Sequence, residues 1–92
     1  MIKSFKHKGL EKFFCNADAR GIQTQMAAHI DRMLDAIDQA QDVNELPLPG
    51  WYLHPLKGDK KHLYSMRVSG NWRITFEFRK GDATMLNLED YH

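Results

Sequence analysis

In the second half of the chain, large apolar side chains recur at every second position, most regularly in the stretch NWRITFEF over residues 71–78. Because side chains of a strand point alternately to opposite faces, this stretch predicts a strand with one apolar and one polar face. Full burial of each large apolar side chain contributes roughly 1.5–3 kcal/mol, so we expect this strand in the middle of a sheet. The apolar positions are Trp72, Ile74, Phe76 and Phe78, and the polar positions are Arg73, Thr75 and Glu77.

The same period of two predicts further strands on either side of this central one. They cover residues 51–57, where Pro55 confines the far end to an edge or a bulge, and residues 62–68. A last strand, in which Thr84, Leu86 and Leu88 alternate, ends at residues 89–92. Turn signals at residues 58–61, 69–70 and 80–82 separate the strands, and the two-residue signal at 69–70 predicts an antiparallel hairpin.

The first half of the chain shows a helical period instead. Residues 24–41 carry one broad apolar stripe without internal Gly or Pro, and Thr24 is a candidate N-cap. A shorter helix is predicted over residues 9–15, a short first strand over residues 1–5 and one extra helical turn over residues 43–46. The expected architecture is α+β, with the N-terminal helices packed on one face of a small, mainly antiparallel sheet. The stripe consists of Met26, Ile30, Met33, Leu34 and Ile37.

Length and cysteine content narrow the class of protein. A chain of 92 residues forms one domain, residues 1–92. The single cysteine, Cys15, excludes an internal disulfide and a cysteine-based zinc site within one chain, and we expect it to be a small buried hydrophobe rather than a nucleophile. No apolar run approaches the ~20 residues of a membrane span, and the first residues lack a signal-peptide core. We therefore expect a complete, cytoplasmic protein with no membrane partner.

The net charge of +1 is unevenly distributed along the chain. Residues 1–20 carry a net charge of +3, residues 21–50 of −4 and residues 51–92 of +2. The middle segment is therefore an unfavourable surface for nucleic acid, whereas the two ends form a basic surface if they meet in space. Three acids of the middle segment, Asp31, Asp35 and Asp38, have the spacing of a solvated helix face, which we favour over a metal site.

Motif scanning leaves few catalytic classes open. The sequence contains no Gly-rich phosphate loop, no G-x-S-x-G and no H-E-x-x-H. Metal-free cleavage of RNA needs a base for the 2′-OH, an acid for the departing 5′-oxygen and a cation for the charge on the phosphate. The candidates for these roles lie in the β half of the chain and are His54, Lys57, Arg73, Asp90, Tyr91 and His92.

Imidazole titrates near pH ~6.5, so His54 and His92 suit the base and the acid, and the sequence leaves open which takes which role. Arg73 and Lys57 suit the phosphate. Taken one at a time, each of these residues is more often a solvated surface group than a catalytic one: most charged strand residues face water, and a terminal histidine is usually frayed.

The other two of the six candidates have supporting roles. Asp90 has the chemistry to orient a histidine through its second ring nitrogen, and Tyr91 to stack on a base or donate a hydrogen bond.

Several stretches in the expected order resemble the HigB toxins of HigB–HigA toxin–antitoxin systems, a family of the RelE/ParE toxin superfamily. They are MIKSFKHKGLEKFF at the start, LPG before Trp51, and then LHPLKGD (53–59), VSGNWRITFEF (68–78) and EDYH (89–92). The chain departs from the expected pattern at Tyr64, where we expect a tryptophan, and in the basic run at residues 60–62. The resemblance covers nearly the whole chain and implies a RelE-like fold.

The resemblance also implies a function: a ribosome-dependent endoribonuclease that cleaves mRNA codons in the ribosomal A site and stops translation, with no metal or other cofactor. On this reading His54, Asp90, Tyr91 and His92 are catalytic, and Lys57 and Arg73 bind phosphate. The implied partners are the ribosome with its mRNA and 16S rRNA, a helix-turn-helix HigA antitoxin, and operator DNA only through the antitoxin. Two alternatives stay open: a ParE-like inhibitor of DNA gyrase, and a degenerate module that only binds its antitoxin.

Overall fold

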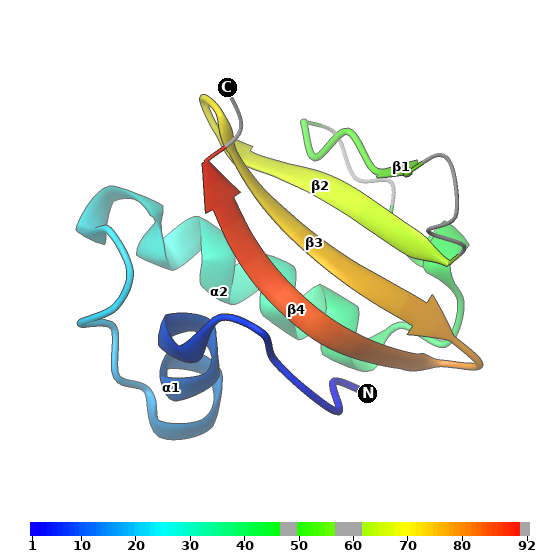
Figure 1. Ribbon diagram of the computed structural model, residues 1–92, viewed down its shortest axis with the longest axis horizontal. Helices are drawn as coiled ribbons and strands as arrows, with labels where there is room; N and C mark the ends of the chain where they lie inside the picture. Colours follow the sequence, from blue (N-terminus) through cyan, green and yellow to red (C-terminus); the bar gives the residue numbers. More distant parts are fainter. Residues whose placement is uncertain (47–49, 57–61, 91–92) are drawn as a thin grey trace.

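A four-stranded antiparallel sheet forms one layer of the molecule and two helices form the other (Figure 1). The computed structural model describes residues 1–46, 50–56 and 62–90. The sheet has the order β1-β2-β3-β4, so neighbours along the chain are neighbours in space, as the hairpin signals predict. The elements are α1 (Lys8–Asn16), α2 (Thr24–Gln39), the 3₁₀ turn η1 (Val43–Glu45), β1 (His54–Pro55), β2 (Leu63–Ser69), β3 (Trp72–Arg79) and β4 (Asp82–Asp90).

The core lies between the helices and the apolar face of the sheet. All five residues of the predicted α2 stripe are buried, and they belong to one core cluster with the buried side chains Ile74, Phe76 and Phe78 of β3. The α+β prediction, with helices on one face of an antiparallel sheet, is therefore confirmed. None of the helices in the described part of the chain is long and apolar enough to cross a membrane.

The helix ends differ from the prediction in two respects. Thr24 is the first helical residue rather than the N-cap; Gln23 takes the cap position, without a side-chain hydrogen bond. The helix ends at Gln39, two residues earlier than expected, where Ala40 turns to an extended backbone. The extra turn predicted at residues 43–46 is present as η1.

The prediction that Cys15 is buried is wrong, because its side chain is exposed. Helix α1 fully buries only Leu10, and the half-buried Phe13 and Phe14 flank the same stripe. Cys15 follows Leu10 by five residues, which places it well to the side of this stripe at 3.6 residues per turn.

The first residues do not form a regular strand, but they lie parallel to β4 through two isolated bridges, Ile2 with Ala83 and Phe5 with Leu86. The backbone N–H of Lys3 donates to the carbonyl of Ala83 at 2.8 Å. The carboxylate of Asp38 accepts a hydrogen bond from the backbone N–H of Ile2 at 2.8 Å. This acid of α2 therefore has a structural contact, whereas the sequence suggested a purely solvated one.

A bulge in β2 sets the register of the β2–β3 hairpin. The turn residues are Gly70 and Asn71, one position later than predicted, so Ser69 pairs with Trp72. Continued without interruption, that register would place Arg67 opposite Ile74, on the apolar face. An irregularity between Arg67 and Ser69 shifts the pairing by one residue, so that Arg67 faces Arg73.

A second bulge, in β4, corrects another prediction. Glu77 pairs with Thr84, but Thr75 pairs with Asn87, so β4 has one residue more than β3 between these pairs. Met85 takes a left-handed φ of 57° there, and its side chain is exposed. Thr84 therefore lies on the polar face beside Glu77, and Ala83 takes the buried place before Leu86.

The strand predicted at residues 51–57 is reduced to the two residues of β1. Tyr52 has a left-handed φ of 50°, which interrupts an extended backbone. Trp51 is nevertheless fixed: it is 7% exposed, and its ring makes a T-shaped contact with the ring of His29 of α2, with centroids 6.0 Å apart. Burial lowers the pKa of the His29 imidazole, and the positive charge of the nearby Arg32 lowers it further. Lys57 and the turn predicted at residues 58–61 lie outside the described residues.

Candidate functional site

A pocket of about 410 Å³ opens on the polar face of the sheet, beside the β2–β3 turn. It brings together His54 and Arg73, two of the residues that the sequence singled out, although they come from strands at different positions in the sheet. The helices cover the opposite face of the sheet (Figure 1). The pocket is lined by Tyr52, His54, Arg67, Gly70, Asn71 and Arg73.

Two arginines face each other across the hairpin. The N–H of Arg67 donates to the carbonyl of Trp51 at 2.7 Å, on the side away from β3. Arg67 and Arg73 are therefore a non-hydrogen-bonded pair, the type in which opposed Cα atoms are only about 4.5 Å apart. Like charges placed directly opposite destabilise a sheet, whereas together they favour an anion such as a phosphate. Glu89 is the partner of Arg73 on the other side, in β4.

His54 is oriented by the backbone of its own segment. Its Nδ1 lies 2.9 Å from the carbonyl oxygen of Tyr52. A neutral imidazole that donates Nδ1–H to this carbonyl has its Nε2 unprotonated and able to accept a proton. His54 pairs with Ser65 in the register, in the row next to the arginine pair, and its side chain is exposed. The site therefore combines a proton acceptor with two guanidinium groups.

The sequence prediction did not include Arg67 or Tyr52. Arg67 lies on the polar parity of its strand, which was a usable signal, but the turn expected at residues 69–70 would have paired it with Trp72. The ring of Tyr52 lies beneath the guanidinium of Arg67, with Cζ 5.7 Å from the ring centroid. No periodic pattern marks Tyr52, because its place depends on a left-handed backbone.

The remaining predicted site residues lie near the end of β4 or outside the described part of the chain. Asp90, the last residue of β4, pairs with Trp72, so it lies next to the hairpin end of the pocket. Strand alternation places Glu89, rather than Asp90, on the face of Arg73. Lys57, Tyr91 and His92 lie outside the described residues.

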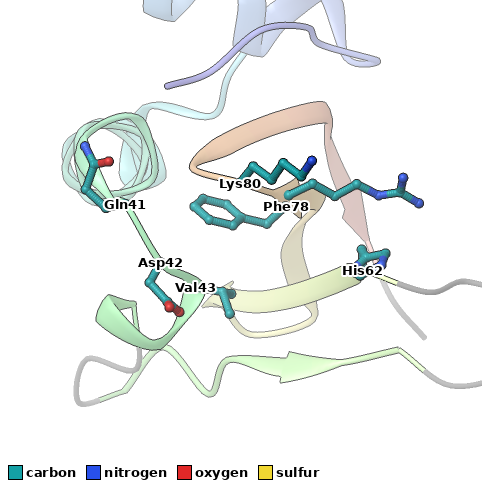
Figure 2. A pocket seen from close by; sticks show the side chains of 7 residues that line it. Gln41, Asp42, Val43, His62, Phe78 and Lys80 are labelled. Carbon is teal, nitrogen blue, oxygen red and sulfur yellow. The ribbon is translucent and has the colours of Figure 1, made fainter.

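A second hollow, of about 420 Å³, also combines a histidine with cations (Figure 2). It lies where α2 runs into η1 and β3 ends, and Arg79 is six residues along β3 from Arg73, roughly 20 Å away. Phe78 and Val43 form an apolar wall, and Asp42 adds an opposing charge. Its lining residues are Gln41, Asp42, Val43, His62, Phe78, Arg79 and Lys80. Its His62 and Arg79 are of the same residue types as His54 and Arg73 of the first pocket.

Within residues 1–46, 50–56 and 62–90, no three side chains of His, Cys, Asp or Glu gather closely enough to hold a metal ion. The pocket beside the β2–β3 turn itself offers an imidazole for proton transfer and two guanidinium groups for binding an anion.

Comparison with known proteins connects this chain to a family. Residues 3–92 match the sequence model of a family described as RelE-like toxin of type II toxin–antitoxin system HigB. The chain is 50% identical over 92 residues to "Endoribonuclease HigB" of Proteus vulgaris, and the match covers 100% of both chains. A solved structure, the YoeB–YefM complex from Staphylococcus aureus, superposes with a TM-score of 0.58 at 18% identity, covering 100% of this chain and 95% of that one.

The structural likeness shows a shared fold and thereby confirms the RelE-like architecture. The family match extends over nearly the whole chain and confirms the resemblance seen in the sequence motifs. This chain belongs to the HigB-like family of RelE-like toxins of type II toxin–antitoxin systems.

Proposed function

We propose that this protein is an endoribonuclease toxin that cuts messenger RNA in the ribosomal A site, by attack of a ribose 2′-OH on the adjacent phosphate. Its full-length relation to a protein named endoribonuclease supports the activity. The single structural observation that carries the mechanism is the grouping of His54 with Arg67 and Arg73 in one exposed pocket.

The proposed reaction divides into proton transfer and charge stabilisation. One imidazole takes the proton of the 2′-OH while the oxygen forms a bond to phosphorus, and another group protonates the departing 5′-oxygen. His54, with Nδ1 held by the carbonyl of Tyr52, fills one of these roles through Nε2, and His92 is proposed for the other. Arg73 and Arg67 stabilise the negative charge that builds on the phosphate oxygens.

The other predicted residues are proposed around this centre. Asp90 orients an imidazole, Tyr91 contacts a base or donates a hydrogen bond, and Lys57 adds a cation beside the phosphate. In this scheme side chains supply all the positive charge that the reaction needs.

As a type II toxin, the protein has an antitoxin as its partner. We propose that this antitoxin is a HigA-like helix-turn-helix protein and that operator DNA is reached only through it. The ribosome is the second partner, with contacts to 16S rRNA and to the codon in the A site. Basic side chains exposed on α1, among them Lys8 and Lys12, are available for such contacts because phosphate backbones attract lysine and arginine.

The proposed mechanism requires the 2′-OH at the cut position. A message with a single 2′-deoxy sugar there should stay intact on programmed ribosomes, while the all-ribose message is cut at that position. Primer extension on both messages measures this directly. Equal cleavage of the two would exclude 2′-OH attack.

Removal of the imidazole should abolish most of the activity. We expect His54→Gln to lower the cleavage rate about 10²–10⁴-fold, the usual contribution of a general acid or base. The matched control is His62→Gln, which removes the histidine of the second hollow (Figure 2) and should leave the rate unchanged. A larger loss in His62→Gln than in His54→Gln would move the site to the second hollow.

A matched pair on one strand tests the guanidinium. Arg73→Gln should lower kcat about 10²–10³-fold, as the loss of one donor to transition-state charge does. Arg79→Gln removes the same charge from the far end of β3 and should retain the activity of the unmodified protein. Single-turnover cleavage on programmed ribosomes compares them, and equal losses would mean that only net charge matters.

A further inference from the structure

We infer that Tyr52 and Arg67 form a platform on which a nucleobase of the message stacks, beside the phosphate that is cut. The inference deepens the proposed function, since it assigns a base-binding subsite to the same pocket. It concerns RNA in single-stranded form, whose unstacked bases proteins bind against aromatic rings and guanidinium planes.

The exposure of Tyr52 is the first observation. Three large hydrophobic residues of the described part of the chain are exposed, and Tyr52 is the aromatic one, 64% exposed. An exposed aromatic ring loses contact with water favourably when a base covers it, and every base has a face that fits. The ring also lies in the wall of the pocket that contains His54 and Arg73.

The position of Arg67 is the second observation. Its Cζ lies 5.7 Å from the centroid of the Tyr52 ring, within the range of a cation–π contact. This contact restricts the orientation of the Tyr52 ring, while most of Tyr52 stays exposed to solvent. Arg67 thus connects the stacking surface to the arginine pair that would bind the phosphate.

The backbone at Tyr52 is the third observation. A φ of 50° is rare for a residue with a side chain, and here it lets the carbonyl of Tyr52 reach Nδ1 of His54 at 2.9 Å. The preceding Trp51 is buried against α2, so the segment has a fixed base. One residue therefore orients the imidazole through its carbonyl and offers its ring to a base, which fixes the distance between base and reacting ribose.

The test is a double-mutant cycle in which the Tyr52 ring and a base of the codon are removed separately and together. Ribosomes are programmed with messages that carry a 2′-deoxy sugar at the cut position and an abasic residue at each position of the A-site codon in turn. Affinity is measured for the unmodified toxin, Tyr52→Ala, Tyr52→Leu and Tyr52→Phe. Tyr52→Leu retains apolar bulk without an aromatic face, and Tyr52→Phe retains the face without the hydroxyl.

We expect Tyr52→Ala and Tyr52→Leu to bind the intact message about 5- to 100-fold more weakly, the range for the loss of one base–aromatic stack. Tyr52→Phe should recover most of that loss. At one codon position, the abasic residue should weaken binding of the unmodified toxin by a similar factor. The same abasic residue should cause almost no additional loss of affinity in Tyr52→Ala and Tyr52→Leu, because these variants already lack the stack. On an all-ribose message, the loss should lie mainly in KM rather than in kcat.

Equal abasic penalties in Tyr52→Ala and the unmodified toxin at every position would overturn the platform, as would undiminished binding by Tyr52→Leu. Failure of the nuclease proposal gives a different result. Binding to the 2′-deoxy message would still depend on both Tyr52 and the base, but the unmodified toxin would leave the all-ribose message uncut. Absence of binding to any programmed ribosome would overturn both. Thermal unfolding by circular dichroism identifies a variant that has lost its fold.

Discussion

The bulge between Arg67 and Ser69 is the constraint on which the proposed site depends. The β2–β3 turn sets one register and the apolar face of the sheet requires another, and one extra residue in β2 reconciles the two. The result aligns Met66 with Ile74 on the buried face and Arg67 with Arg73 on the open one. The packing of the core and the cationic pocket are therefore two consequences of a single register.

Burial outweighs the repulsion that this register creates. Opposed like charges in a sheet cost at most about 1 kcal/mol, whereas burial of a large apolar side chain contributes roughly 1.5–3 kcal/mol. Strand β3 buries three such side chains, Ile74, Phe76 and Phe78, in the same pairing. The packing of the helices on one face of the sheet stabilises the register. On the other face, this register brings two guanidinium groups and an imidazole together. The proposed chemistry therefore lies on the face of the sheet that the core does not use.

Periodicity predicted most of the fold because burial leaves a direct trace in the order of residues. The α2 stripe and the alternation of β3 are examples, since each places its apolar side chains on one face at a fixed period. The position of Arg73 on the polar face followed from the alternation of β3, whereas the strand predicted around His54 is reduced to His54–Pro55. Periodicity failed where one residue breaks the repeat: at Thr84, which the bulge at Met85 moves to the polar face, and at the left-handed Tyr52. Arg67 was missed for the same reason, because its partner is decided by the bulge rather than by its own strand.

Cross-strand contacts in isotopically labelled protein, measured by nuclear Overhauser effects, test the register most directly. A non-hydrogen-bonded pair brings its two Hα atoms close together, so the bulged register predicts a strong Hα–Hα effect between Arg67 and Arg73, and another between Ser65 and Thr75. A strong effect from Arg73 to Val68, with none to Arg67, would contradict it. The two arginines would then lie on opposite faces of the sheet, and the pocket described here would not exist.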